Sequence, residues 1–537
     1  MRLLLLGLIL LQSSPFEDGL RAYREGRYEE AARLLSHVEG EEATYEVWLD
    51  LGLAEGHLQH LPESRRALDR AIALAPERPE AWTERGGLSF LETHYEEAIR
   101  DLKKSLSIRE DAYTRDLLAS ALYLSGQDDQ ALAEWNRLGK PKIRTLTISG
   151  LRYAKDKVAR EEIHMEEGEL LDVRALKEAR LRLKEVGIFD RVTLRPIPQG
   201  DGTADLEVAL VERHGFGSLA GIAVGAGVDA IFSRRVDLGY ADLGGEGASA
   251  SALYRFQSTR PLLALTLDWP RPLGAPFYLE LRSYLGKQDY ALPDGAFQTK
   301  GGGGDLKARL VVGPGGVLEL GISDIHRTFS VPRADGAPGT IVGIKAGLEQ
   351  TLVSTARQRW SVEGRVFETA SALGSDLRYT KAIGATRYRA ILGPPEGVAI
   401  EKWVLAAQFQ AGWSTSGAPI DQRFAPGGSP DMELPLRAHP QDQGGVLGAT
   451  PIGRSLVIGN TEARVRIIRT TFVSLGGVVF YDAARIGNAT GGASPIFHDV
   501  GVGLRLAPLA GPMVRADYGR GLTDGSHAFF VGLGQVF

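Results

Sequence analysis

Apolar and polar residues alternate with a period of two over the last three-fifths of the chain, from about Gly215 to Phe537. The run LALTLDW at 263–269 is one example, and VGVGLRL at 500–506 is another. Successive strand side chains point to opposite faces, so each segment has one apolar face and one small, polar or charged face. A soluble sheet rarely keeps this pattern without a second apolar core, whereas a transmembrane barrel sets one face against lipid and the other against a wet lumen. The pattern predicts a transmembrane antiparallel β-barrel over residues 214–537.

The strand-like segments recur about every twenty residues, turn included, so the barrel is expected to have about 16 strands. Such a barrel closes where its first and last strands pair. The last strand is expected over residues 528–537. It contains Gly532 and Gly534 before Phe537, and these glycines would let the strand kink and weaken the seam. The run of four glycines at 301–304 is expected to form a hairpin turn.

The first 14 residues are typical of a secretory signal peptide, because Arg2 precedes a short apolar run and small residues follow it. That run is too short to cross a bilayer as a helix. The chain has no cysteine, which excludes a lipoprotein anchor, disulfides, thiol catalysis and cysteine-based metal sites. Acidic side chains predominate in residues 15–140, a balance that argues against nucleic acid as a partner.

Residues 15–140 are predicted to form helical pairs that repeat with a period near 34. Trp48 and Gly52 recur as Trp82 and Gly86, with small residues where two helices approach and aromatic residues between units. The pattern resembles the tetratricopeptide repeat. Such arrays form curved solenoids that bind extended protein segments, so the resemblance implies periplasmic protein partners. The alternative is that the array is only a spacer.

Residues 141–213 are predicted to form a small α/β module in the order βααββ. Its strands are expected at 143–148, 189–194 and 206–210, and its helices at 154–163 and 173–186. Together with GIFDRV at the helix-to-strand corner, 187–192, this order resembles a POTRA (polypeptide-transport-associated) domain. In that family an exposed strand edge is thought to accept extended client segments by β-augmentation.

A long insertion at 414–452 interrupts the strand pattern of the barrel. It contains the sequence RFAPGG, whose motif residues are Arg423, Phe424, Gly427 and Gly428, and later LRAH at 436–439. With the single POTRA-like module before the barrel, these residues resemble the BamA/TamA-type superfamily of outer-membrane assembly and translocation barrels, also called the bacterial surface antigen family. The family's inward-folded loop carries R-F-x-x-G-G and then aliphatic-Arg-Gly-aromatic. Ala438 and His439 depart from the second signature.

The resemblance also implies how the loop is held. The period-two pattern points Asp482 and Glu462 into the lumen, and Phe480-Tyr481-Asp482 is similar to the family's F-x-D motif. The family's aspartate pairs with the loop arginine, so Arg437 is expected to bind Asp482, with Glu462 as a second acceptor. In a wet lumen such a pair contributes about 1 kcal/mol or less, and more if water is excluded. The alternative is that each is only a solvated residue of the barrel wall.

The sequence thus predicts a multidomain chain with an all-α tetratricopeptide solenoid, a small α/β POTRA domain and a C-terminal barrel. The resemblance implies an outer-membrane protein, with its N-terminal domains in the periplasm, that assists insertion or translocation of unfolded or extended client proteins. No cofactor loop, metal-ligand spacing or nucleophile–base arrangement points to an enzyme. One alternative is a secretion pore for one exported partner, although the usual second POTRA module and plug helix are not found. The other is a periplasmic interaction scaffold on an inert barrel.

Overall fold

The computed structural model describes residues 15–38, 43–213, 215–216, 225–332, 336, 338–428, 433–490, 496–508 and 512–537. The signal peptide expected at residues 1–14 lies outside these ranges. None of the described helices is long and apolar enough to cross a membrane.

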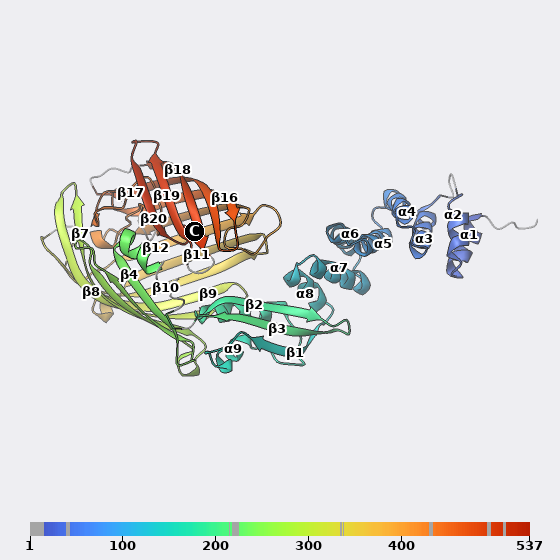
Figure 1. Ribbon diagram of the computed structural model, residues 1–537, viewed down its shortest axis with the longest axis horizontal. Coiled ribbons are helices and arrows are strands. Elements are labelled where there is room, and N and C mark those ends of the chain that lie inside the picture. The colour runs from blue at the N-terminus through green and yellow to red at the C-terminus, as the bar shows by residue number, and fades with distance from the viewer. Residues whose placement is uncertain are drawn as a thin grey trace, which may run out of the picture. The chain divides into compact units, whose positions relative to one another are not determined.

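In the part of the chain that the structure describes, eight helices form the N-terminal repeats (Figure 1). They are α1 (Pro15–Arg24), α2 (Tyr28–Leu35), α3 (Tyr45–His57), α4 (Leu61–Leu74), α5 (Pro79–Leu91), α6 (Tyr95–Ile108), α7 (Ala112–Leu124) and α8 (Asp128–Asn136). A glycine allows close packing within a pair. A Cβ at Gly52 would lie 2.8 Å from Cγ of Leu68, and one at Gly86 would lie 2.8 Å from Cγ of Leu102. The same contact 34 residues apart confirms the predicted helical repeat.

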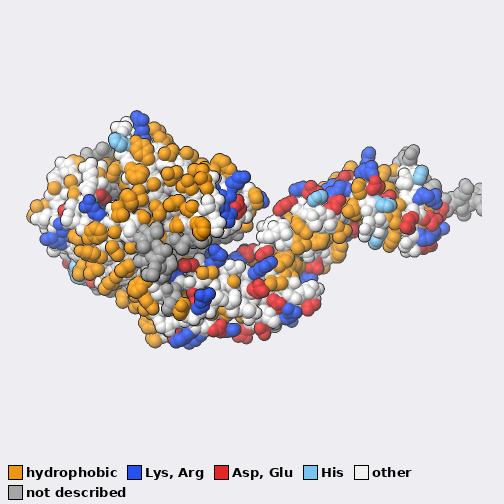
Figure 2. Space-filling view, viewed as in Figure 1, with side chains coloured by type: hydrophobic (Ala, Val, Ile, Leu, Met, Phe, Trp, Pro, Cys, Tyr) orange, Lys and Arg blue, Asp and Glu red, His pale blue; other side chains and the backbone are white. Residues whose placement is uncertain are grey.

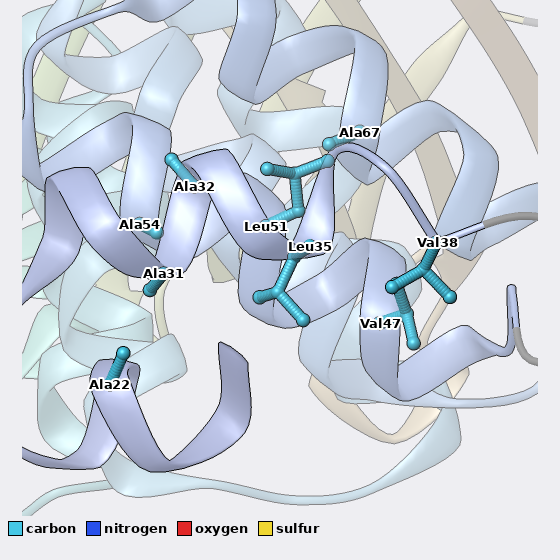
Figure 3. Packing of buried hydrophobic residues seen from close by; sticks show 9 residues of the cluster. All are labelled: Ala22, Ala31, Ala32, Leu35, Val38, Val47, Leu51, Ala54 and Ala67. Atoms are coloured by element: carbon cyan, nitrogen blue, oxygen red, sulfur yellow. The ribbon is translucent and has the colours of Figure 1, made fainter. Parts of the chain in front are cut away.

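Small residues also fill the space between the first helices (Figure 3). One buried cluster consists of Ala22, Ala31, Ala32, Leu35, Val38, Val47, Leu51, Ala54 and Ala67. Five of its nine members are alanine, so the helices can approach closely while the larger aliphatic side chains occupy the remaining gaps. This packing explains why the repeat is visible in the sequence as recurring small residues.

The module that follows has the predicted βααββ order. Its elements are β1 (Lys142–Ser149), α9 (Asp156–Ile163), α10 (Val173–Glu185), β2 (Phe189–Pro198) and β3 (Thr203–Glu212). The sheet order is β1-β3-β2, so β1 and β2 are its edges. Gly150 has a φ of +90°, and a Cβ there would lie 1.9 Å from the carbonyl oxygen of Leu210. Only glycine fits this position.

The barrel sheet contains seventeen strands in the described residues, which agrees with the expected number. The long strands are β4 (Arg235–Leu243), β5 (Ala248–Arg255), β6 (Leu262–Pro270), β7 (Tyr278–Leu292), β8 (Gly295–Val311), β9 (Gly316–Phe329), β10 (Gly339–Ser354), β11 (Gln358–Thr369), β12 (Thr380–Ile391), β13 (Trp403–Ser414), β16 (Gly453–Arg469), β17 (Val473–Ala489), β18 (Ile496–Pro508), β19 (Val514–Gly521) and β20 (His527–Leu533). The short β14 (Asp442–Gln443) and β15 (Val446–Leu447) lie in the insertion between β13 and β16. Long strands that are consecutive along the chain pair antiparallel, for example β16 with β17 and β13 with β16 across the insertion.

The two faces of the barrel wall differ as the alternation predicts. On β17, Val479 and Tyr481 are 56% and 40% exposed on the outer face, whereas Phe480 and Asp482 are 5% and 0% exposed on the inner face. Figure 2 shows apolar side chains spread over the outside of the barrel, where a soluble protein would place charges. This surface is suited to lipid.

Two expectations about the barrel differ from the structure. The glycines at 301–304 lie in the middle of β8 and form no hairpin turn, so that expectation is wrong. A Cβ at Gly301 would lie 2.1 Å from the carbonyl oxygen of His326, so these glycines permit a close approach of β9 to β8. The last strand ends at Leu533 rather than Phe537, because Gly534 has a φ of +73° and turns the chain out of the strand.

Candidate functional site

The described residues of the insertion between β13 and β16, 415–428 and 433–452, fold against the inner wall of the barrel. Its first half is anchored by a two-way backbone pairing of Phe424 with Gly453, with both N–H···O distances 2.9 Å. The ring of Phe424 is 2% exposed and packs in an apolar cluster with inward-facing residues of two strands. The other buried members of this cluster are Leu436, Leu456, Ile458, Ala484, Ile486 and Ala489.

The remaining residues of RFAPGG shape the loop. Arg423 donates from Nε to the carbonyl oxygen of Ala418 at 2.9 Å. A Cβ at Gly427 would lie 2.6 Å from the backbone nitrogen of Gln441, and one at Gly428 would lie 2.2 Å from Cε2 of Phe530. The two glycines therefore leave room for the returning half of the loop and for an aromatic side chain of β20.

Arg437 lies at the centre of the site with no exposed surface. It donates from Nε to Oδ2 of Asp482 at 2.8 Å and from Nη2 to Oδ1 at 2.7 Å. Its Nη1 donates to Glu462, and its guanidinium carbon lies 3.5 Å from the centroid of the Phe480 ring. This is the bidentate geometry in which arginine binds carboxylate most strongly. The structure thus brings the three residues of the expected latch into contact.

Water is excluded from this pair, because the side chains of Arg437, Asp482 and Glu462 are all 0% exposed. Asn460 donates from Nδ2 to Asp482 at 2.9 Å, which satisfies part of the remaining acceptor capacity. For a buried pair of this kind, removal of one partner costs about 3–5 kcal/mol, because the other charge stays buried and uncompensated. Loss of one partner is therefore expected to cost far more here than in a wet lumen.

The two departures from the loop signature have their own partners. The backbone N–H of Ala438 donates to Oδ2 of Asp499 at 2.6 Å. His439 places Nδ1 2.8 Å from Oδ1 of Asp499 and Nε2 2.9 Å from Oδ2 of Asp524. Its Nε2 also lies 2.9 Å from Oγ of Ser526. Asp499 thus holds two successive loop residues from β18.

The environment favours a protonated His439. Burial alone would lower the pKa of this imidazole, but the hydrogen bonds and negative charges of Asp499 and Asp524 outweigh burial and raise it. Asp524 lies in the turn between β19 and β20. Its pKa is lowered to about 2, because burial is outweighed by hydrogen bonds from Ser526 and by the charge of His439. His439 therefore joins the loop to two elements of the barrel.

Sequence reasoning did not find Asp499 and Asp524. The alternation on β18 does point Asp499 inward, next to the apolar Val500, so a signal for this residue existed. No such signal existed for Asp524, because the alternation of inward and outward side chains applies to strands and not to turns. Of the residues expected at the seam, Gly532 lies in β20 facing the guanidinium of Arg515, whereas Gly534 and Phe537 lie beyond the strand.

The fold and this loop define a class of protein, a transmembrane barrel with a periplasmic α/β module and a lumenal loop. Residues 356–537 match the Omp85 superfamily domain, and residues 141–213 match the surface antigen variable number repeat, a POTRA domain. The chain therefore carries an Omp85 superfamily domain and a POTRA domain, as the resemblance implied. Its barrel resides in the bacterial outer membrane, and its repeats and POTRA domain are periplasmic.

Solved structures and a curated relative are similar to parts of the chain. CdiB from Escherichia coli has the same fold with a TM-score of 0.52 and 10% identity, over 73% of this chain and 76% of that chain. BamA from Haemophilus ducreyi lacking POTRA domains 1–3 is 15% identical over 73% of this chain and 84% of its own, with a TM-score of 0.42. A TPR repeat-containing protein of Rhizobium etli is 29% identical over 119 residues, which is 22% of this chain. The chain spans about half the length, 52%, of that relative.

Proposed function

We propose that this protein assists the insertion or translocation of other proteins at the outer membrane, without catalytic chemistry, and that Arg437 latches its lumenal loop during the closed state. The bidentate contact of Arg437 with Asp482 is the observation that carries the proposal. A plain diffusion pore has no use for a loop that is fixed inside its lumen by a fully buried ion pair. A protein that changes between a closed and an open state does need such a loop, because the ion pair can hold the closed state.

The departures at Ala438 and His439 are compatible with this role. The Ala438 side chain is 0% exposed, so its methyl group is accommodated in the packed loop. Asp499 accepts from the Ala438 backbone and pairs with the His439 ring. The loop thus has a second anchor, Asp499 on β18. His439, which takes the place of the aromatic residue in the family signature, binds to it.

Client proteins would first meet the periplasmic domains. Both β1 and β2 are edges of the POTRA sheet, but Ile143 at the start of β1 already exchanges backbone hydrogen bonds with Gly168 and Glu169. An extended client segment can add to β2 or to the later part of β1 through backbone hydrogen bonds. The helical repeats would collect clients or partner proteins by the same preference for extended segments. The clients are therefore defined by an extended backbone.

Depletion of the protein followed by an inventory of envelope proteins tests the proposed function. Full-length wild type should restore the missing outer-membrane proteins, whereas Arg437→Gln and Asp482→Asn should not. Arg387→Gln is the matched control, since Arg387 is also lumenal and paired, with Glu363 at 2.8 Å and Gln408 at 2.9 Å, but does not touch the loop signature. Full restoration by both latch variants would contradict the latch.

The same assay separates the alternatives. Loss of a single exported protein would identify a dedicated secretion pore instead. Deletion of residues 15–140 should leave partial activity if the barrel and POTRA domain handle clients themselves. Complete loss of activity with a stable, membrane-inserted barrel would favour an interaction scaffold.

A further inference from the structure

The last residue of β20, Leu533, and the residues that follow it are bound to the lumenal face of the barrel. Arg515 of β19 donates from Nη1 to the carbonyl oxygen of Leu533 at 2.9 Å and to that of Gln535 at 3.3 Å. Arg505 of β18 donates from Nε to the side-chain oxygen of Gln535 at 3.0 Å. Arg464 of β16 donates from Nη2 to the main-chain oxygen of Phe537 at 2.8 Å. Three arginines from three strands therefore hold residues 533–537, which are called the tail below.

These arginines belong to the interior of the barrel. Arg464, Arg505 and Arg515 are 7%, 1% and 3% exposed. The guanidinium carbon of Arg464 also lies 5.6 Å from the centroid of the Phe537 ring, within the range of a cation–π contact. The aromatic residue that was expected to end a lipid-facing strand instead lies beside a lumenal arginine.

Glu462 connects the tail to the loop latch. One carboxylate oxygen, Oε2, accepts from Nε of Arg464 at 2.6 Å. The other, Oε1, accepts from Arg437 and lies 3.7 Å from Nη2 of Arg505. A single buried carboxylate therefore lies between the arginine that holds the loop and two arginines that hold the tail.

The buried arginines of this cluster need the tail as a source of hydrogen-bond acceptors. Four buried guanidinium groups, those of Arg437, Arg464, Arg505 and Arg515, face three buried carboxylates, those of Glu462, Asp482 and Asp517. Buried guanidinium N–H groups need acceptors. The carbonyl oxygens and the amide side chain of the tail supply acceptors that the carboxylates do not.

We propose that Glu462, Arg464 and Arg505 couple the tail to the loop latch, so that the tail stays in the lumen only while Arg437 occupies Glu462. Arg464 and Arg505 are then positioning residues for the strand that precedes the tail. The purpose of the coupling rests on the proposed function, because release of the loop would also free the end of β20 at the seam. The coupling itself does not depend on the proposed function, because its contacts are present in the protein without a client.

The absence of cysteine from the chain allows a direct test with one introduced thiol. Val536→Cys places it in the tail, at a residue whose neighbours Gln535 and Phe537 make the contacts described above. The full-length protein is reconstituted in nanodiscs, which leave both ends of the barrel open to water. Val536 is only partly buried while the arginines hold the tail. The rate of reaction with a water-soluble maleimide above that of the unsubstituted background therefore reports how far the tail has been released.

The Arg464→Gln and Arg437→Gln backgrounds should each raise the labelling rate about tenfold or more. The first removes the donor to Phe537, and the second removes the loop's contact with Glu462. Arg464→Lys keeps a positive charge but lacks the second arm that reaches Phe537, so its increase should be smaller than that of Arg464→Gln. The matched control Arg387→Gln should label at the rate of the unsubstituted background. Heat-modifiable migration of the barrel verifies that each variant is folded.

A faster rate in Arg464→Gln with an unchanged rate in Arg437→Gln would overturn the coupling, since the tail would then be held independently of the loop. An unchanged rate in both would show that the arginines do not hold the tail. Labelling requires no client, so a failure of the proposed function in the envelope inventory would leave the labelling result intact. Equally, a negative labelling result would leave the envelope inventory intact, so each proposal can fail without the other.

Discussion

Gly519 of β19 lies against the backbone of Arg437, so closely that a Cβ at position 519 would stand 2.5 Å from the arginine carbonyl oxygen. Two residues further along, a Cβ at Gly521 would lie 3.0 Å from Cε1 of His439. Both glycines face the lumen on the hairpin β19–β20, at the seam of the barrel. The loop therefore rests directly on the backbone of β19 at these two positions.

Substitution of Gly519 by alanine should loosen the loop. The new methyl group meets a backbone carbonyl, which cannot rotate away as a side chain could, so the loop or β19 must shift at a cost of about 1–3 kcal/mol. Limited proteolysis should then cut within residues 415–452 faster than in the wild type. Gly364→Ala is the control, because a Cβ at Gly364 of β11 meets nothing within 4 Å. Equal cleavage of the two variants would contradict the close packing of loop on hairpin.

Removal of the latch charge should destabilise the folded barrel more than an exposed ion pair would. Arg437→Gln or Asp482→Asn alone should lower the free energy of unfolding by about 3–5 kcal/mol, since either leaves a buried charge. The double variant should cost less than the sum of the two, and the difference measures the coupling between the residues. Urea unfolding of the detergent-folded protein supplies all three values. Additive effects would mean that the two residues do not act on each other.

The attachment of His439 should depend on pH. The folded pKa of His439 is raised above its ordinary value of 6.5, chiefly because Asp499 and Asp524 outweigh burial. Its contribution to stability is therefore fully present below about pH 6.5 and is lost as the pH rises through the folded pKa. Protease access to the loop should increase as the pH is raised from about 6 to about 9.

His439→Phe is the matched variant, because an aromatic ring keeps the contact with Phe497, whose centroid lies 4.5 Å away, but cannot titrate. Its loop should show a flat pH profile in this range. A wild-type profile that is equally flat would show that the imidazolium does not hold the loop. An identical slope in both proteins would assign the pH dependence to another group.

The sequence predicted the features that depend on solvent and on spacing along the chain. Lipid and lumen select different residue types, so the inward direction of Asp482 and Glu462 can be derived from parity alone. The contact of His439 with Asp524, in a turn 85 residues away, cannot be derived in this way. It depends on how the loop folds back across the barrel. The glycines at 301–304 were misinterpreted for a related reason. A turn and a close strand approach both need glycine, and the carbonyl of His326 that decides between them lies on another strand.

The helical repeats offer a prediction in which two similar substitutions have opposite signs. Alanine is a better helix former than glycine by about 1 kcal/mol, so a Gly→Ala change inside a helix stabilises wherever the methyl group fits. At Gly87 of α5 it fits, with the nearest atom, Cδ2 of Leu117, at an ordinary 3.7 Å. At Gly52 of α3 it does not, because Cγ of Leu68 would be only 2.8 Å away.

Gly87→Ala should therefore slow hydrogen exchange of the repeat helices, whereas Gly52→Ala should accelerate exchange in α3 and α4, where the helix pair must separate to admit the methyl group. Exchange within the barrel strands should be unchanged in both variants of the full-length protein. Slower exchange in Gly52→Ala would show that Leu68 can move aside, and that the glycine there is not required by the packing of the pair. Faster exchange in both would mean that the interface beyond Gly87 is tighter than its 3.7 Å separation implies.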